Sequence, residues 1–247
     1  MGEVSGYAEG VPSWVDLATG DPEAAIAFYS KLLGWEVEDG PGYHFCRVRG
    51  HAVAGINGQP PPEGIPTAWT PYLAVDDADA VAARIAASGG RMIFEPRDVH
   101  TEGRAAWAED PQGAVFGLWQ AGDHVGATLT GEPGTMVWTE LSTPDLDAAQ
   151  PFYAEVFGHV WEPLDAGGVR YATFAVDGEP VGGALEETPG SSAIWTPTFG
   201  VADTDQAVAV ASRLGADTIA GPADSPYGRY AAFRDPQGAF FSVISVV

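Results

Sequence analysis

Two acidic residues, each two positions after a tryptophan, are the side chains of this chain best suited to chemistry. Asp16 follows Trp14, and Glu140 follows Trp138. Side chains alternate along a strand, so each acid would share one sheet face with its tryptophan. A carboxyl group on a concave aromatic surface loses water, which raises its pKa toward the range useful for proton transfer. We predict that both acids are catalytic; the alternative is a structural role, paired with an arginine such as Arg47 or bonded to backbone amides.

Other aromatic and polar side chains of expected strands are candidates to line a ligand site. Aromatic walls with a few polar groups are typical of sites for planar or apolar small molecules. The alternative is that the aromatic side chains only fill a core. The predicted ligand-binding residues are Trp14, Tyr43, His44, Thr70, Tyr72, Trp107, Trp119, Trp138, Tyr171, Thr196 and Thr198.

The histidines and the single cysteine do not indicate a metal or nucleophilic site. The five histidines show no H-x-x-H or H-E-x-x-H spacing, and only His44 lies on a strand that could face a cavity. We therefore predict no metal and no other cofactor. Cys46 cannot form an internal disulfide and reads as a buried strand thiol; a nucleophilic Cys46 next to His44 would lack an orienting third group.

A long internal repeat sets the positions of these residues. The motifs at Trp14, Phe28-Tyr29, Trp69 and 110–113 recur at Trp138, Phe152-Tyr153, Trp195 and 235–238, with an offset of 124 to 126 residues. A repeat of this length is a duplicated domain rather than a solenoid unit. The boundaries that we predict are domain 1 over residues 1–122, a linker over 123–134 and domain 2 over 135–247, with each domain large enough to bury a core.

Each half is expected to contain two similar β-rich modules. A strand over 14–18 is followed by a helix over 24–33, with Asp21 as N-cap and Gly34 as stop, and then by a hairpin over 43–48 and 52–56. A second strand over 69–75 leads to a helix over 77–88 and to strands near 91–94, 104–108 and 114–120. On the first strand, Trp14 and Asp16 would point away from the helices. Which modules pair with each other stays open.

Composition excludes several classes of partner. The chain has 34 acidic and 11 basic residues, a formal charge of −23, so its field repels nucleic acids and anionic membranes. No apolar stretch is long enough to span a bilayer, and nothing near the N-terminus resembles a signal peptide. We expect a cytoplasmic protein, a monomer or homodimer, whose partner is an aromatic or apolar small molecule. No phosphate loop, dinucleotide motif or G-x-S-x-G elbow is present.

The repeated motifs resemble the vicinal oxygen chelate superfamily, which includes glyoxalase I, bleomycin-resistance proteins and extradiol dioxygenases. The resemblance rests on Trp-x-Asp/Glu-Leu, the Asp-initiated helix with Phe-Tyr, Val-Asp-Asp-Ala-Asp and the closing Asp-Pro-Gln-Gly-Ala, and it covers nearly the whole chain. The most similar subgroup is that of tandem glyoxalase-like proteins of actinobacteria. The resemblance implies an α+β fold of four βαβββ modules, which form two cup-shaped sheets with helices outside.

The same resemblance implies a metal site in each cup, but its ligand positions hold unsuitable residues. They fall on Trp14 and Trp138, on Thr70 and Thr196, on Gly117 and Ser242, and near Gly55 and Gly183. An indole or a glycine supplies no metal ligand.

Three functions follow. We favour a metal-free cup that binds an aromatic or polyketide-like molecule in specialised metabolism, with isomerisation, epimerisation or cyclisation by proton transfer through Asp16 or Glu140. The alternatives are non-catalytic drug binding, as in bleomycin resistance, and a metal-dependent lyase or dioxygenase. The wall residues of the two halves differ, so one cup should bind ligand better than the other.

Overall fold

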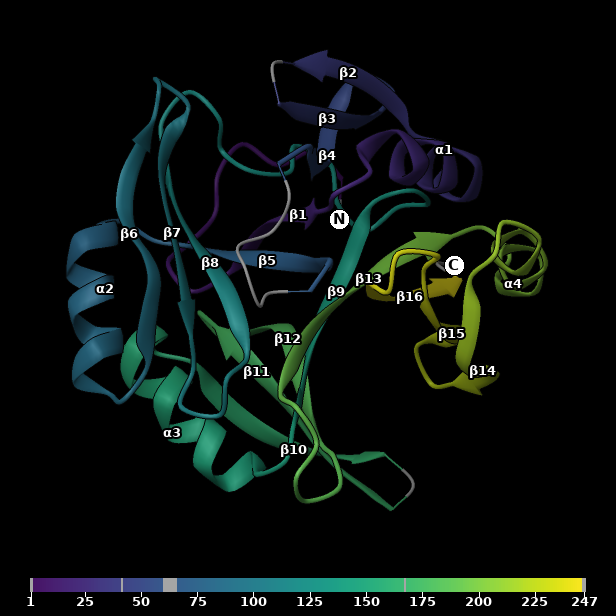
Figure 1. The fold of residues 1–247 in the computed structure, drawn as a ribbon. Coiled ribbons are helices and arrows are strands. Elements are labelled where there is room, and N and C mark those ends of the chain that lie inside the picture. Colours follow the sequence, from purple (N-terminus) through teal and green to yellow (C-terminus); the bar gives the residue numbers. More distant parts are fainter. Residues whose placement is uncertain (1, 41, 60–65, 167, 246–247) are drawn as a thin grey trace.

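The computed structural model describes residues 2–40, 42–59, 66–166 and 168–245, which form two eight-stranded sheets and four helices (Figure 1). The first half contains β1 (Pro12–Ala18), α1 (Pro22–Leu33), β2 (Glu36–Gly40), β3 (Tyr43–Val48), β4 (His51–Asn57), β5 (Ala68–Ala74), α2 (Ala78–Ala87), β6 (Arg91–Val99), β7 (Gly103–Glu109) and β8 (Val115–Ala121). The second half contains β9 (Met136–Thr143), α3 (Leu146–Phe157), β10 (Val160–Ala166), β11 (Val169–Val176), β12 (Glu179–Glu186), β13 (Ile194–Val201), α4 (Thr204–Arg213), β14 (Asp217–Ser225), β15 (Gly228–Arg234) and β16 (Phe240–Ser245).

Each sheet is built from the two modules of one half. The strand orders are β2-β3-β4-β1-β5-β8-β7-β6 and β10-β11-β12-β9-β13-β16-β15-β14. The first strands of the two modules, β1 and β5, pair antiparallel at the centre of the sheet, and β9 and β13 repeat this pairing. The α+β fold of four modules in two curved, open sheets is therefore confirmed, and the modules pair within each repeat. Figure 1 shows the helices on the convex sides of both sheets.

Helix α1 begins directly after its predicted N-cap, Asp21, two residues before the expected range, and α2 begins at Ala78, one residue after its expected start. An aspartate caps each of the four helices, and the Asp21 carboxylate accepts a hydrogen bond from the backbone N–H of Ala24 at 3.0 Å. This bond satisfies a donor that has no partner within the helix. Gly34, with φ of 73°, ends α1 in a left-handed conformation that favours glycine. The sequence did not reveal β2, because its polar, largely exposed residues lack an apolar alternation.

The hydrophobic cores are shared between the halves, although each half is long enough to bury a core of its own. One core joins β1 and α1 of the first half to β13, α4, β15 and β16 of the second. The other joins β5, α2, β7 and β8 to β9, α3, β11 and β12. In Figure 1, α1 accordingly lies beside α4, and α2 beside α3. Each sheet contains strands of one half only, whereas each hydrophobic core contains residues of both halves.

The stretch between β8 and β9 packs against both sheets. The backbone N–H of Ala127 donates to the carbonyl of Ser13 at 2.8 Å, and the N–H of Gly134 donates to the carbonyl of Gly200 at 2.8 Å. The indole N–H of Trp35 donates to the carbonyl of Gly134 at 2.6 Å. In the described part of the chain, no helix is both long and apolar enough to cross a bilayer.

Candidate functional site

The concave faces of the two sheets are called here the first cup (β1–β8) and the second cup (β9–β16). On β1, Val15 and Leu17 join the core under the helices, while Trp14 belongs to a separate cluster in the first cup. Asp16 alternates with Val15 and Leu17 and faces the same cup as Trp14. The predicted orientation of the Trp-x-acid motif is thus the one found in the first half.

A hydrogen-bonded network holds Asp16. The hydroxyl of Tyr72 donates to its Oδ2 at 3.1 Å, and that of Tyr43 makes a longer contact at 3.5 Å. The indoles stand behind the tyrosines: Trp14 donates to the Tyr43 hydroxyl at 2.8 Å, and Trp107 donates to the Tyr72 hydroxyl at 2.6 Å. Four predicted lining residues therefore surround the predicted acid.

The Asp16 carboxyl group is nearly inaccessible. It is 4% exposed, and its Oδ1 has no hydrogen-bond partner. Burial raises the pKa of Asp16 to about 7, although the hydrogen bonds from Tyr72 and Tyr43 lower it. Arg47, the suggested ion-pair partner, instead binds Glu38 at 2.7 Å.

The first cup is filled by its own side chains. Trp14, Tyr72, Trp107 and Trp119 are all buried there. His124, from the stretch that leads to the second half, places its ring edge-on to Trp14 at a centroid distance of 4.6 Å. This stretch therefore covers the first cup above Trp14.

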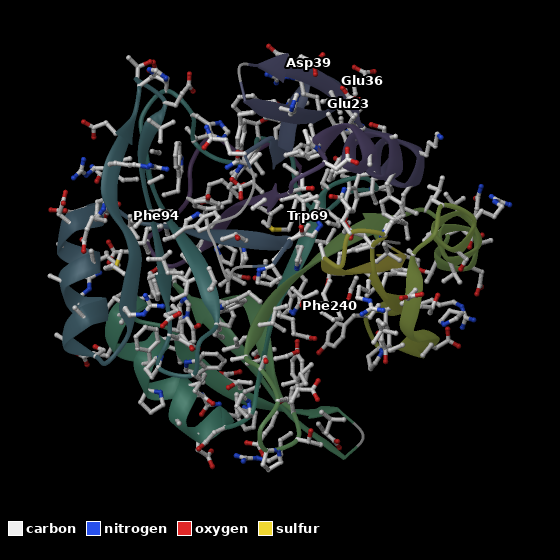
Figure 2. All side chains as sticks on the ribbon, in the orientation of Figure 1. Glu23, Glu36, Asp39, Trp69, Phe94 and Phe240 are labelled. Carbon is white, nitrogen blue, oxygen red and sulfur yellow. The ribbon has the colours of Figure 1, made fainter. Side chains whose placement is uncertain are left out.

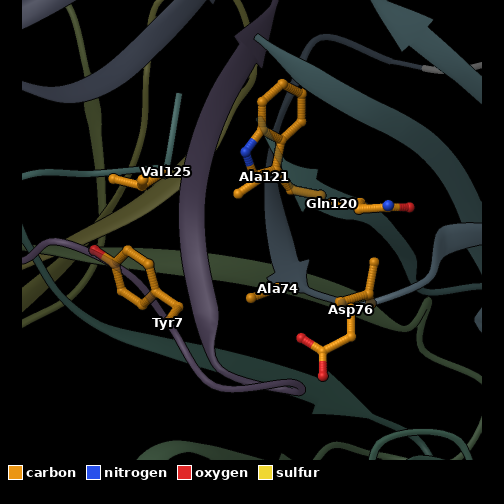
Figure 3. Close-up of a pocket in the computed structure, with 8 residues that line it drawn as sticks. Tyr7, Ala74, Asp76, Gln120, Ala121 and Val125 are labelled. Atoms are coloured by element: carbon orange, nitrogen blue, oxygen red, sulfur yellow. The ribbon is translucent and has the colours of Figure 1, made fainter. Parts of the chain in front are cut away.

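A small hollow opens at one end of the first cup, beside Trp119 (Figure 3). Its volume is about 180 Å³, and Tyr7, Ala74, Asp76 and Val125 are among the residues that line it. Asp16 is not part of its lining. The hollow does not give a ligand access to the buried acid.

The second cup repeats the Trp–Tyr–acid arrangement with greater exposure. The indole of Trp138 donates to the hydroxyl of Tyr171 at 3.0 Å, and the Tyr171 hydroxyl lies close enough to Glu140 to lower its pKa. All three side chains are partly exposed. Burial raises the pKa of Glu140, the Tyr171 hydroxyl lowers it, and the nearby charge of Glu187 raises it further. A partly desolvated carboxyl group thus faces an accessible concave surface.

Strand register explains why the second cup is less filled. Trp107 pairs with Gly117 across β7 and β8, and Ala232 pairs with Ser242 across β15 and β16. Ala232 therefore stands where the first cup has Trp107. Tyr72 is the register partner of Trp14, and Thr198 is the register partner of Trp138, so Thr198 takes the place of Tyr72 in the second cup. Thr196, two residues away, lies on the same face. Both threonines are partly exposed, whereas Thr70 and Tyr72 are buried.

Three exposed aromatic residues of the second half were not predicted as site residues. Tyr230 is 37% exposed, Phe240 is 38% exposed and Tyr227 is 67% exposed. Tyr230 and Phe240 alternate with the core residues Ala231 and Phe241, so they lie on the concave face. In Figure 2, Phe240 lies on the inner side of the second sheet. Tyr227, in the β14–β15 turn, is close enough to influence the pKa of Tyr171.

His44 is a correction to the predicted lining. Its register partner Ile56 belongs to the core under α1, so His44 faces the helix side of the sheet. Its Nδ1 lies 3.0 Å from the carboxylate of Asp39. Cys46 points the same way into that core, and burial raises its pKa far above the usual range, which opposes a nucleophilic role.

The positions expected for metal ligands do not fit a divalent cation. A Cβ atom at Gly55 would overlap the Tyr43 hydroxyl, and one at Gly117 would overlap the Tyr72 ring. At Gly183 the Tyr171 hydroxyl takes the same space. Tyrosines therefore occupy the room that ligating side chains would need. Within the described residues, no group of three or more His, Cys, Asp and Glu side chains could hold a metal ion.

Two Gly-Arg pairs, Gly103-Arg104 and Gly228-Arg229, recur at equivalent positions of the two halves and have structural roles. Arg104 binds Asp79 on α2 at 3.0 Å and Asp98 on β6 at 2.8 Å. Arg229 repeats this arrangement with acidic residues of α4 and β14. Each arginine thus links a helix to an outer strand through ion pairs and does not reach into a cup.

The fold and the sequence together define the class of protein. Residues 12–118 match the Glyoxalase/Bleomycin resistance protein/Dioxygenase superfamily, and residues 138–244 match a glyoxalase-like domain. The chain belongs to this superfamily, as a tandem of two such domains.

Full-length relatives support this assignment. CFP32 of Mycobacterium tuberculosis (strain CDC 1551 / Oshkosh), provisionally named a glyoxylase, is 42% identical over 99% of this chain and 98% of its own. The anthracycline biosynthesis protein DnrV of Streptomyces peucetius is 37% identical over 97% of this chain and 94% of its own.

Solved structures share the fold at lower identity. The Mn(II)-bound glyoxalase of Novosphingobium aromaticivorans aligns with a TM-score of 0.66 at 18% identity, over 96% of this chain and 83% of that one. Homoprotocatechuate 2,3-dioxygenase of Arthrobacter globiformis aligns with a TM-score of 0.68 at 18% identity, over 98% and 81%. At this identity the likeness establishes the fold alone.

Proposed function

We propose that the protein binds a planar aromatic or polyketide-like small molecule in the second cup and that Glu140 transfers a proton on it. The observation that carries the proposal is the difference between two equivalent surfaces. The first cup buries its acid under tryptophans and tyrosine, whereas the second pairs its acid with an accessible wall of smaller side chains. Exposed aromatic residues on a concave face are typical of a binding surface.

In the proposed reaction, the Glu140 carboxylate accepts a proton from an acidic C–H group of the ligand and returns it at another atom. The net change is an isomerisation, which requires no oxidant or co-reactant. Tyr171, which lies next to Glu140, would orient the carboxyl group, and Trp138 holds Tyr171 through the indole N–H. The raised pKa of Glu140 favours uptake of the proton near neutral pH.

Relatives give this proposal a chemical context. DnrV and DauV of Streptomyces, both named anthracycline biosynthesis proteins, cover nearly the whole chain at 37% and 36% identity. We therefore propose that the activity belongs to specialised metabolism. We further propose a cytoplasmic monomer or homodimer as the working unit. The high negative charge argues against nucleic acid or membrane surfaces as partners.

Binding and proton transfer can be tested separately. Binding of 9-anthracenemethanol, a neutral three-ring probe, should quench tryptophan fluorescence in the wild type and in Glu140→Gln, but only weakly in Trp138→Ala. Proton transfer should appear as deuterium exchange of the acidic C–H groups of 2-tetralone, followed by NMR. Exchange should disappear in Glu140→Gln and persist in the matched variant Asp16→Asn.

The outcomes distinguish the candidate functions. Exchange that needs Glu140 supports catalysis in the second cup. Binding without exchange in the wild type would leave drug sequestration as the function. Exchange lost only in Asp16→Asn, with the variant folded, would move the site to the first cup.

A further inference from the structure

The second cup has an acidic interior. Glu140 lies in its floor, and the charge of Glu187, just beyond β12, acts on Glu140. Glu162 on β10 is the register partner of Thr173 on β11. Thr173 is two residues from Tyr171, so Glu162, Thr173 and Tyr171 lie on the same face of the sheet. Three carboxyl groups therefore surround the part of the cup that holds the Trp138–Tyr171–Glu140 network.

Little positive charge opposes these acids. The basic residues Arg170 and Arg229 alternate to the convex face, where they bind Asp147 and Asp205 of the helices. Among the basic residues of the described strands β9 to β16, only Arg234 alternates to the concave face. Its guanidinium binds Asp217 at 2.7 Å, which offsets its charge. An anion that entered this cup would meet no free cation from these strands.

The first cup differs in this respect. The Arg47 guanidinium lies 5.8 Å from the centre of the Phe45 ring, and that of Arg97 lies 5.3 Å from the Phe94 ring. Their charges act on His124 and Tyr72, respectively. The first cup thus has two arginines near its network, one of them paired with Glu38, whereas Glu162 and Glu187 lie around the equivalent network of the second cup.

Aromatic side chains complete the recognition surface. Trp138 and Tyr171 lie toward one wall, and Tyr230 and Phe240 lie on strands of the other. Aromatic faces attract cations, and this attraction strengthens when water is excluded. A carboxylate in the same place would be repelled by Glu140 and Glu187.

We propose that the second cup selects planar aromatic ligands that carry a positive charge or none over those that carry a carboxylate. This specificity rests on the proposed function, because it assumes that the second cup binds an aromatic molecule. Three probes of similar shape test it: the 9-aminoacridine cation, neutral 9-anthracenemethanol and the 9-anthracenecarboxylate anion. Their affinities are measured by fluorescence titration near pH 7.5.

The expected order is cation, then neutral probe, then anion, with about a tenfold difference between cation and anion at low salt. The ratio should shrink as salt rises from about 0.02 M to about 0.5 M, because ions screen partly exposed charges. In Glu187→Gln the ratio should fall about threefold, as expected for one charge at several ångströms.

A matched variant separates the cup from the overall charge of the protein. Glu155 is exposed on α3, on the convex side of the second sheet. Glu155→Gln removes the same charge and should leave the ratio unchanged. Equal effects of the two variants would overturn the proposal in favour of the general field.

The remaining outcomes separate the two proposals. Equal affinity for all three probes would overturn the charge selectivity and leave the proposed function standing. Tighter binding of the anion would do the same. Failure of all three probes to bind would overturn the aromatic cup itself.

Discussion

Tyr29 donates a 2.8 Å hydrogen bond to the carboxylate of Asp235, 206 residues further along the chain. Tyr153 makes the equivalent bond to Asp110 at 3.0 Å, so each half supplies the tyrosine for the other half's aspartate. Both bonds are buried. The repeated Phe-Tyr and Asp-Pro-Gln-Gly motifs are therefore contacts between halves, at the two shared cores.

Removal of one of these bonds should destabilise the whole molecule. Tyr29→Phe leaves a buried carboxylate oxygen of Asp235 without its donor and the buried indole N–H of Trp69 without its acceptor, each at a cost of about 1–3 kcal/mol. Urea denaturation should show a lower midpoint and still a single transition by fluorescence and circular dichroism, because the cores are shared. Tyr230→Phe, which removes an exposed hydroxyl, is the control and should change stability by less than about 0.5 kcal/mol. Two separate transitions would contradict the shared cores.

The buried Asp16 should make stability fall as the pH rises. Its folded pKa of about 7 lies above the ordinary value of 3.8 for an aspartate, so the folded state holds the proton more tightly than the unfolded chain. The stabilisation is complete below about pH 4 and is lost as the pH rises through about 7, by roughly 2–4 kcal/mol. Asp16→Asn should flatten this dependence in thermal unfolding measured between these pH values. A wild-type profile that matches Asp16→Asn would show that Asp16 titrates normally.

The sequence predicted much of the fold because its signals are local. Aspartate caps, the glycine at position 34 and the alternation around Trp14 placed the helices, the first strand and its concave face. The shared cores could not be predicted, since an apolar face shows that a helix packs but not against which half. Alternation could have excluded His44, which is adjacent to Tyr43 and must face the opposite side of the strand.

The site was predicted in part for a related reason. The equivalent positions of Trp107 and Ala232 were visible in the sequence, and they indicated unequal cups. Which cup is filled depends on register and on the stretch around His124, and both are tertiary features. Phe240 beside Phe241 gave a usable signal, because two adjacent aromatic residues on a strand cannot both enter the core under the helices.

Filling the second cup should abolish binding. Thr198→Tyr with Ala232→Trp restores the residues of the first cup at equivalent positions and removes the space for a ring. Affinity for 9-anthracenemethanol should fall by at least about tenfold, with the far-UV circular dichroism unchanged. Unchanged affinity in a folded double variant would place the ligand elsewhere.

Opening the first cup should cost stability rather than create function. Trp107 is buried and bonded to Tyr72, so Trp107→Ala should destabilise the protein by about 3–5 kcal/mol. Probe affinity at the second cup should stay within about twofold of the wild type under folded conditions. A loss of binding as large as that of Trp138→Ala would implicate the first cup in recognition.

Divalent metals should not bind stoichiometrically at the family positions. Tyr43 and Tyr171 occupy the space that ligating side chains would need at Gly55 and Gly183. Calorimetric titration with Mn²⁺, Fe²⁺ and Zn²⁺ should show no site with a dissociation constant below about 10 μM. Tight binding of one metal ion per half would show that the tyrosines do not keep metal ions out of these positions.

The ligand site can be located by a crystal structure of the protein with 9-aminoacridine. We expect the planar ring in the second cup, between Trp138 and Phe240 and next to Glu140, with the first cup still filled by its own side chains. A ring bound beside Asp16, with His124 displaced from Trp14, would show that the first cup is the ligand site and that the second is not.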